Sequence, residues 1–200
     1  MRVIAGTYRS RPLVAPRGPL TRPTSDRLRE TLFNILSPRI PGARFADLYA
    51  GTGAVGIEAL SRGAAHVLFA ERAPPALAAL RSNLHTLGIT SGFTLEPRSS
   101  TAALDRLLDL FHDRPHPTPT QPFHILFLDP PYEAAAEYTS TLALLGSSRA
   151  QPLLAPAALI VAEHSSKSPL PPSFGHLHQT RTLKQGDAAL TFYAPHAPPA

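Results

Sequence analysis

From residue 44 to the C-terminus, the chain alternates between short apolar runs and amphipathic stretches. The apolar runs are typical of buried strands, whereas the amphipathic stretches repeat their apolar residues at helical spacing. The runs predict strands over 44–51, 66–71, 92–97, 123–129 and 157–165, and the stretches predict helices over 54–63, 74–88, 100–113 and 134–146. Strands separated by helices favour a parallel sheet that is covered on both faces.

The two ends of the chain depart from this alternation. Residues 1–16 predict a small β-hairpin, and residues 21–42 predict a helix that Thr24 or Ser25 can cap. Residues 176–195 predict two further strands with no helix between them, so one of the two must run antiparallel to the rest of the sheet. The pattern therefore predicts an α/β fold with a seven-stranded, mostly parallel sheet, one antiparallel strand and an N-terminal hairpin.

Composition excludes several classes of protein. Apolar residues make up 43% of the chain, and no apolar run is long enough to cross a bilayer. The first residues lack the apolar core of a secretory signal, which favours a soluble cytoplasmic protein. Cysteine is absent, which excludes disulfides, thiolate metal sites and cysteine nucleophiles, and we expect no metal site of another kind.

Positive charge is concentrated at the N-terminus. Residues 1–30 hold seven arginines against Asp26 and Glu30, while the other 170 residues carry twelve basic and twelve acidic groups. The guanidinium group binds phosphates in a bidentate manner and stacks on bases. A basic arm on a neutral body is typical of a protein that binds nucleic acid. The alternative is a solvated arm in a chain that uses arginine for nearly all of its basic residues.

The segment after the first predicted strand is a glycine turn. Gly51, Gly53 and Gly56 fit the pattern G-x-G-x-x-G, which lets a ligand approach the backbone at the start of a helix. Glu71 follows the second predicted strand, twenty positions after Gly51, where a carboxylate can hold the hydroxyls of a ribose. Nicotinamide, flavin and S-adenosylmethionine folds all use such turns, and Glu71 can also be a surface charge at a strand end.

The fourth predicted strand distinguishes among these cofactors, because it ends in Asp129-Pro130-Pro131-Tyr132. Methyl transfer from a sulfonium is an in-line displacement that needs a correctly aimed lone pair. The exocyclic amine of a nucleobase is a poor nucleophile, since its lone pair is delocalised into the ring. Asp129 and the Pro130 carbonyl can accept hydrogen bonds from the two N–H groups and so turn the lone pair outward, while Tyr132 stacks on the base. The Asp-Pro-Pro-Tyr motif therefore favours S-adenosylmethionine as the cofactor.

Several motifs resemble one bacterial family. The stretches RVIAGTYRSRPL, RPTSDRLRETLFNIL, DLYAGTGAVGIEALSRGA, FLDPPY and QGDAALTFY are together similar to the RsmD-type family, in collinear order from Arg2 to about Tyr193. The resemblance implies a Rossmann-like class I methyltransferase that uses S-adenosylmethionine to methylate N2 of a guanine in small-subunit (16S) ribosomal RNA. Ribosomal RNA or a precursor of the small subunit would be its partner, and we expect a monomer.

The hydrophobic pattern, the charge distribution and the resemblance together give domain boundaries and site residues, and the resemblance itself implies the roles of Gly51, Gly53, Glu71 and Asp129–Tyr132. We predict a basic RNA-binding hairpin over 1–20, a methyltransferase domain over 21–195 and a disordered tail over 196–200. The predicted catalytic residues are Asp129, Pro130, Pro131 and Tyr132; the cofactor site is Asp47, Tyr49, Gly51, Gly53, Glu71, Arg72 and Ser99; and the RNA contacts are Arg2, Arg9, Arg11, Arg22, Thr24 and Arg29. Many relatives have an aspartate or asparagine after the third strand, where this chain has Arg98-Ser99-Ser100.

Other functions remain open at this point. A methyltransferase that acts on adenine N6 or cytosine N4 can use the same motif, although 200 residues leave no room for a DNA target-recognition domain. Protein-glutamine methyltransferases typically have asparagine before the double proline, whereas this chain has Asp129 there. A cytosine carbon-5 methyltransferase is excluded because it needs a cysteine. A non-catalytic RNA-binding assembly factor that kept the fold is the alternative from another class.

Overall fold

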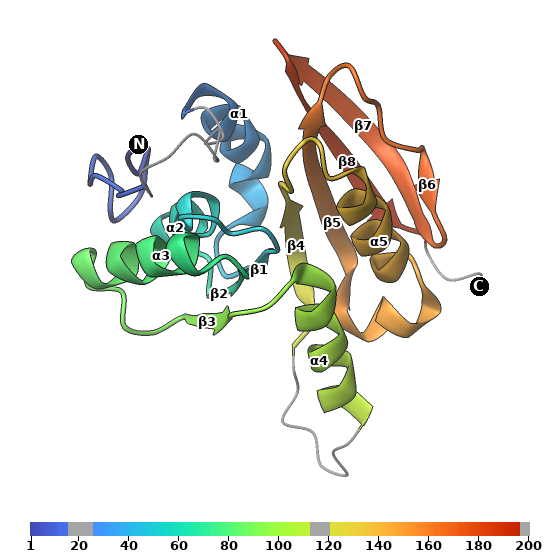
Figure 1. Cartoon of the computed structure of the whole chain (residues 1–200), viewed down its shortest axis with the longest axis horizontal. Coiled ribbons are helices and arrows are strands. Elements are labelled where there is room, and N and C mark those ends of the chain that lie inside the picture. The colour runs from blue at the N-terminus through green and yellow to red at the C-terminus, as the bar shows by residue number, and fades with distance from the viewer. Residues whose placement is uncertain (16–25, 113–120, 197–200) are drawn as a thin grey trace. The chain divides into compact units, whose positions relative to one another are not determined.

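The computed structural model describes residues 1–15, 26–112 and 121–196, in two compact units, Met1–Ser99 and Ser100–Ala200 (Figure 1). Both predicted capping residues of the first helix, Thr24 and Ser25, lie outside the described residues, as do residues 197–200 of the predicted tail. Within the described part of the chain, no helix is both long and apolar enough to cross a membrane.

The first unit contains a three-stranded parallel sheet in the order β3-β2-β1. Asp47 of β1 pairs with Phe69 of β2, and Ala70 of β2 pairs with Glu96 of β3. In chain order, the elements of this unit are α1 (Asp26–Leu36), η1 (Ser37–Arg39), β1 (Arg44–Asp47), α2 (Ala54–Ser61), β2 (His66–Ala70), α3 (Pro74–Thr86) and β3 (Phe93–Glu96). The carboxyl ends of β1, β2 and β3 lie side by side in this register, which brings the residues that follow them to one edge.

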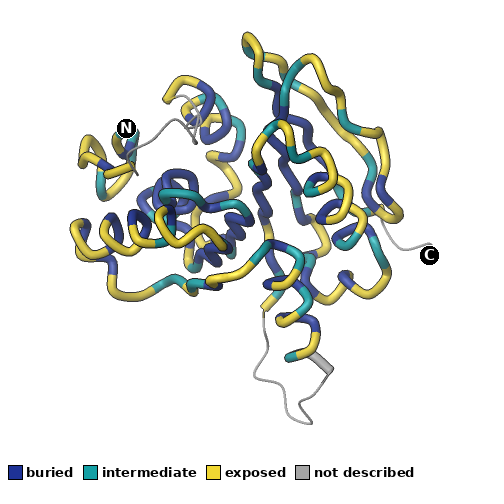
Figure 2. Tube along the Cα trace, viewed as in Figure 1, coloured by how far each residue is buried: buried dark blue, intermediate teal, exposed yellow. Residues whose placement is uncertain are grey.

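The core of the first unit is built from aromatic and aliphatic side chains of these strands and helices. Phe33 of α1 and Phe45 of β1 are fully buried and stack with their ring centroids 6.4 Å apart. Apart from the half-buried first residue of each, β1 and β2 are buried along their length, whereas β3 is partly exposed (Figure 2). Burial on both faces explains why the first two strands read as continuous apolar runs in the sequence.

An N-terminal hairpin belongs to this first unit. Arg2 and Pro12 form an antiparallel bridge, and Val3 exchanges backbone hydrogen bonds with Ser10 and Arg11 at 2.9 and 3.0 Å. Val3 and Leu13 are buried, so the hairpin contributes two apolar side chains to the core of the unit. The predicted hairpin is therefore confirmed, and it is a packed element.

The second unit contains a mixed sheet in the order β4-β5-β8-β7-β6. β4 and β5 are parallel, whereas β8 runs antiparallel to both of its neighbours, β5 and β7. In chain order, the elements are α4 (Ser100–His112), β4 (Phe123–Leu128), α5 (Ala135–Leu145), η2 (Ser148–Leu153), β5 (Leu154–Ser165), β6 (Ser173–Phe174), β7 (Leu177–Gln185) and β8 (Ala188–Pro195).

The predicted α/β fold is confirmed within the described residues: β1, β2 and β3 are parallel in the first unit, and in the second unit β4 and β5 are parallel while β8 is antiparallel to β5 and β7. The sequence does not predict the 3-10 helix η1, which follows α1 inside the predicted helix 21–42, nor the strand β6 and the 3-10 helix η2. β6 has two residues, and η2 contains Pro152, so neither has a periodicity that a sequence pattern can reveal. β5 begins at Leu154, three residues before the predicted start.

Candidate functional site

The glycine turn connects β1 to α2 in the first unit. Gly51 and Gly53 have φ angles of +54° and +81°, which non-glycine residues rarely adopt. A Cβ at Gly53 would overlap Leu80, and one at Gly56 would overlap the ring of Phe69. A Cβ at Gly51 would meet no atom within 4 Å, so the backbone there faces open space. The turn thus presents bare backbone at the start of a helix, as a cofactor site requires.

Glu71 follows β2 and closes the turn from the side. Its Oε2 atom accepts a hydrogen bond from the Gly51 N–H at 2.8 Å, and its Oε1 atom accepts one from the Ala73 N–H at 2.6 Å. The side chain is half-buried, and a carboxylate has about four lone-pair sites, so it can still accept hydrogen bonds from a ligand. The structure therefore brings the predicted ribose acid directly to the glycine turn.

Asp47 lies beneath the turn and not on its surface. It is 1% exposed, and its Oδ2 atom accepts a hydrogen bond from the Gly56 N–H at 2.8 Å. Burial raises the pKa of Asp47 to about 7; the Gly56 N–H opposes this rise and the nearby Glu71 adds to it. Asp47 therefore anchors the start of α2 under the turn, and it is the titratable group of this region with the largest shift.

We expect this burial to make stability depend on pH. Between its ordinary value of 3.8 and about 7, the carboxyl of Asp47 holds a proton in the folded state that the unfolded chain has released. The free energy of unfolding should fall as pH rises through this window, with a contribution of about 1.4 kcal/mol per pH unit from this group. In Asp47→Asn that contribution should vanish. Urea unfolding of both proteins from pH 4 to 8 checks this, and equal pH slopes would contradict it.

The remaining predicted cofactor residues lie around this turn and strand edge. Tyr49 is half-buried, Arg72 is exposed, and Ser99 is half-buried at the end of the first unit. Sequence reasoning did not single out Glu96, a nearly buried carboxylate at the end of β3 whose Oε2 atom forms a 3.0 Å ion pair with Arg98 Nε. The backbone carbonyl of Glu96 also accepts a hydrogen bond from the Glu71 N–H at 3.1 Å.

The motif Asp129–Tyr132 follows β4 in the second unit. Asp129 and Tyr132 are half-buried, Pro130 is buried and Pro131 is exposed. The Tyr138 hydroxyl, from α5, lies 3.1 Å from the Pro130 carbonyl oxygen and 2.8 Å from the Glu163 carbonyl oxygen. The hydroxyl proton is shared between these two carbonyls, and because a carbonyl oxygen has two lone pairs, the Pro130 carbonyl can still accept a second hydrogen bond from a ligand. Tyr138, which sequence reasoning missed, thus fixes the carbonyl that the sequence assigned to amine binding.

Glu163 and His164 of β5 point to opposite sides of the sheet, as adjacent strand residues do. Glu163 is 5% exposed and accepts a 3.4 Å hydrogen bond from the Tyr132 hydroxyl, so its side chain contacts the motif Asp129–Tyr132. His164 is buried, and its Nε2 atom lies 2.8 Å from Thr191 Oγ1 on β8. Burial lowers the pKa of His164, which makes it a neutral core histidine.

The predicted RNA-binding residues divide into three groups. Arg2, Arg9 and Arg11 are exposed on the hairpin, and Arg11 Nη2 donates to the Thr86 carbonyl of α3 at 3.1 Å. Arg22 and Thr24 lie outside the described residues. The third group is Arg29 alone.

Arg29 differs from the expectation of an RNA contact, because its side chain is fully buried. Its Nη2 atom donates to the Arg2 carbonyl at 2.5 Å and pairs with Asp26 Oδ1 at 3.0 Å. Burial lowers the pKa of Arg29, while the carboxylates of Asp26 and Glu58 oppose that shift. Arg29 therefore supports the hairpin from the interior of the unit, and the prediction that it contacts RNA is wrong.

The hairpin is fixed to α2 by two buried side chains. Glu58 accepts hydrogen bonds from the Ile4 N–H at 2.7 Å and the Ala5 N–H at 3.0 Å. Ser61 Oγ accepts from the Tyr8 N–H at 2.9 Å and donates to the Ala5 carbonyl at 2.5 Å. A charged acceptor forms stronger hydrogen bonds than a neutral one. The predicted basic arm is thus a docked element beside α2 (Figure 1).

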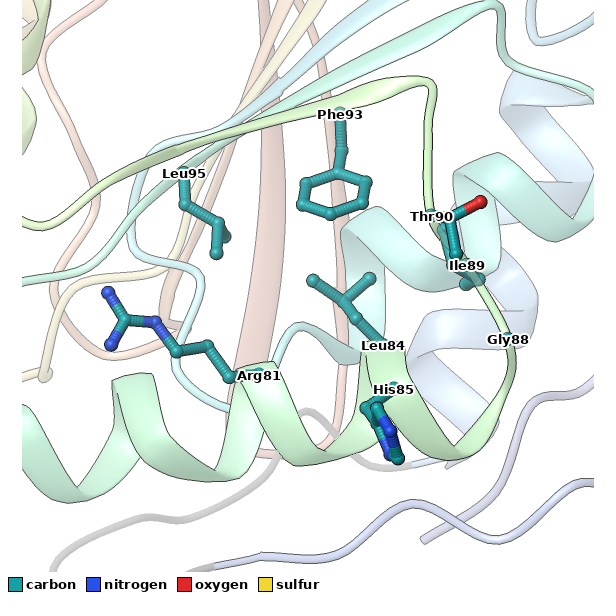
Figure 3. A pocket seen from close by; sticks show the side chains of 8 residues that line it. All are labelled: Arg81, Leu84, His85, Gly88, Ile89, Thr90, Phe93 and Leu95. Carbon is teal, nitrogen blue, oxygen red and sulfur yellow. The ribbon is translucent and has the colours of Figure 1, made fainter.

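A pocket of about 240 Å³ lies between α3 and β3 (Figure 3). Its walls are mainly apolar, with the Phe93 ring facing Leu84 and the Arg81 side chain at one end. None of the predicted site residues lines it, so we assign it no part in the site. Among the described residues, no three His, Asp or Glu side chains gather where they could hold a metal ion.

Comparison with known proteins gives a consistent result. The profile of the family described as "Conserved hypothetical protein 95" matches residues 1–194. The chain is 36% identical over 193 residues to YlbH of Bacillus subtilis, which is 96% of this chain and 98% of that protein. It is 34% identical over 187 residues to "Ribosomal RNA small subunit methyltransferase D" of Escherichia coli, covering 92% of this chain and 86% of that one.

Solved structures extend the likeness from sequence to fold. The chain is similar to the Escherichia coli protein yhhF, with a TM-score of 0.78, 33% identity and 99% of both chains covered. It is also similar to a hypothetical protein of Thermus thermophilus, with a TM-score of 0.76, 28% identity and coverage of 96% of this chain and 98% of that chain.

Proposed function

The chain belongs to the family described as "Conserved hypothetical protein 95", the RsmD-type family, and from that membership we propose that it transfers a methyl group from S-adenosylmethionine to the exocyclic N2 of a guanine in small-subunit ribosomal RNA. Two relatives that match 92% and 85% of this chain are named as methyltransferases of small-subunit ribosomal RNA. The single observation that supports an exocyclic amine as the acceptor is the motif Asp129–Tyr132, with its Pro130 carbonyl held by the buried Tyr138 hydroxyl, and the choice of guanine N2 follows from the family resemblance.

The chain's residues fit the cofactor. S-adenosylmethionine supplies a methyl group on a positively charged sulfur. The open backbone at Gly51 and the carboxylate of Glu71 match the adenosine part of such a ligand, because a ribose presents two hydroxyl donors to a carboxylate. We assign Gly51, Gly53 and Glu71 to direct contact and Asp47 to support beneath the turn. Tyr49, Arg72 and Ser99 complete the proposed cofactor site.

The motif after β4 would prepare the acceptor. The carboxylate of Asp129 accepts a hydrogen bond from one amine N–H, and the Pro130 carbonyl accepts one from the other. These bonds draw the nitrogen lone pair out of conjugation and aim it for in-line attack, in which a nitrogen–carbon bond forms as the sulfur–carbon bond breaks. The nitrogen becomes cationic and then releases its proton. Tyr132 stacks on the base, which must be unpaired or flipped out of its helix to reach the motif.

Loss of the ribose contact should weaken cofactor binding. A hydrogen bond to a charged group contributes about 1.5–3 kcal/mol, so Glu71→Ala should raise the dissociation constant of S-adenosylmethionine roughly tenfold or more. Part of that change would come from the Gly51 N–H, which loses its acceptor. Calorimetric titration measures the constant, with the exposed Glu30→Ala as a matched control. An unchanged affinity in Glu71→Ala would remove Glu71 from the cofactor site.

The exposed arginines of the hairpin should carry the electrostatic part of RNA binding. Each phosphate contact contributes about 0.7–0.9 to the slope of log affinity against log salt concentration. Replacing Arg2, Arg9 and Arg11 together with alanine should flatten that slope while cofactor affinity stays unchanged, because the backbone bonds to Glu58 remain. Filter binding over a series of salt concentrations measures it, with the exposed Arg106→Ala of α4 as control. If the wild type, the triple variant and Arg106→Ala gave equal slopes, the hairpin would be excluded as the phosphate contact.

The proposed function is tested by methyl transfer in vitro. The purified protein, labelled S-adenosylmethionine and either small-subunit ribosomal RNA, small-subunit particles or duplex DNA are incubated in parallel. We expect label in the RNA or the particles and none in DNA. Label in DNA alone would support the DNA methyltransferase alternative, and binding of RNA without any transfer would support an assembly factor.

A further inference from the structure

One buried side chain joins the RNA-binding hairpin to the glycine turn. Asn83 of α3 is 2% exposed. Its Oδ1 atom accepts a hydrogen bond from the Val14 N–H at 2.7 Å, and its Nδ2 atom donates to the Val14 carbonyl at 3.0 Å and to the Thr52 carbonyl at 2.9 Å. Both amide protons and one lone pair are therefore used, each toward the backbone of another segment.

The two segments that Asn83 bridges are the two proposed binding elements. Thr52 is the middle residue of the turn Gly51-Thr52-Gly53, whose first N–H is held by Glu71. Val14 lies at the end of the hairpin that carries Arg2, Arg9 and Arg11. The Val14 side chain is 57% exposed, so its two backbone bonds to Asn83 hold this end of the hairpin in place.

A second set of contacts also joins the hairpin to the glycine turn, through α2. Gly53 is the N-cap residue of α2, and Glu58 and Ser61 on that helix hold residues 4–8 of the hairpin. The hairpin is thus attached at one end to the helix that starts at the turn and at the other end to Asn83. Both attachments lie within the first unit.

From this geometry we propose that Asn83 is a positioning residue that couples the cofactor turn to the hairpin, so that cofactor and RNA strengthen each other's binding. A planar amide turns as one body, so fixing its Nδ2 donor on the Thr52 carbonyl also fixes its Oδ1 acceptor for the Val14 N–H. A ligand that orders the turn therefore orders the hairpin, and by linkage an RNA that orders the hairpin tightens the turn to the same degree. The inference rests on the proposed function, which assigns a ligand to each element.

The test is a binding cycle that contains no chemical step. The dissociation constant of a small-subunit ribosomal RNA transcript is measured with and without saturating S-adenosylhomocysteine, and that of S-adenosylhomocysteine with and without RNA. In the wild-type protein, each ligand should lower the other's constant by the same factor, roughly fivefold or more. In Asn83→Asp, which keeps the acceptor for Val14 but loses both donors, the factor should fall to about one.

A matched control and a second readout keep the result interpretable. Ser82→Ala, at the exposed neighbouring position on α3, should keep the wild-type factor. In the wild-type protein, S-adenosylhomocysteine should also slow hydrogen exchange at the Val14 amide several-fold, a measurement that needs no variant. Coupling that survives in Asn83→Asp, or a Val14 amide that does not respond, would overturn the inference while both ligands still bind. A wild-type protein that binds no S-adenosylhomocysteine would overturn the proposed function itself, and the inference with it.

Discussion

Replacing Asp129 with alanine is expected to lower the rate of methyl transfer by at least about a hundredfold while cofactor affinity changes little. The size follows from losing a preorganised hydrogen-bond partner of the reacting group, which typically costs a factor of about 10²–10³ in turnover. A carboxylate is too weak a base to deprotonate a neutral aryl amine before attack, so Asp129 acts mainly by orienting the amine. Asp129→Asn keeps an acceptor oxygen and should therefore retain more activity than Asp129→Ala.

Single-turnover methylation of small-subunit particles separates these effects from binding. Tyr132→Phe is the matched control, since it keeps the stacking ring and removes the hydroxyl that lies 3.4 Å from Glu163 Oε1. It should be nearly silent, whereas Tyr132→Ala should lose a stacking contribution of about 1–3 kcal/mol. An Asp129→Ala protein with turnover near that of the wild type would exclude the proposed role of Asp129–Tyr132 in orienting the amine and leave the motif as the end of a strand.

The second large effect is expected on stability. Glu58 is completely buried, where it accepts from two hairpin N–H groups and pairs with Arg62 Nε at 2.7 Å. Removing one partner of a buried ion pair typically costs about 3–5 kcal/mol, because the other charge and its hydrogen-bonding groups lose their partner. Glu58→Ala should therefore lower the free energy of unfolding by about that amount. The buried Arg29, whose charge Glu58 also supports, adds to the loss.

Urea unfolding measures this change, and limited proteolysis reports whether the hairpin is released first. Glu30→Ala, an exposed glutamate on α1, is the control and should be within about 0.5 kcal/mol of the wild type. Glu58→Gln keeps an acceptor oxygen without the charge and should fall between the two. A loss below about 1 kcal/mol in Glu58→Ala would mean that the hairpin does not depend on this carboxylate.

The sequence predicts features that are local along the chain. The alternation of apolar runs and helical periodicity locates each principal strand, because burial on both faces leaves a continuous apolar run. The turn at Gly51 and Gly53 is equally local, since positive φ angles at a strand end select glycine. The closure of that turn by Glu71 follows from the pairing of parallel strands, whose ends meet at one edge.

The sequence does not predict contacts between residues far apart in the chain. The bonds from Ile4 to Glu58 and from Val14 to Asn83 span 54 and 69 positions, and neither polar residue interrupts the periodicity of its helix. Charge alone predicts an RNA contact at Arg29, because it cannot distinguish an exposed arginine from a buried one. Tyr138 lies in a helix of small and apolar residues, where an aromatic residue indicates packing, and only the fold shows that its hydroxyl reaches the Pro130 carbonyl.

The identity of the methylated nucleoside decides whether the protein methylates guanine N2 in small-subunit ribosomal RNA. Small-subunit particles are incubated with S-adenosylmethionine and either the wild-type protein or Asp129→Ala, and the RNA is digested and analysed by mass spectrometry. We expect N2-methylguanosine from the wild-type protein, at one nucleotide, and little or none from Asp129→Ala. Methylation of adenine N6 or of another position, or equal amounts of product from both proteins, would contradict it.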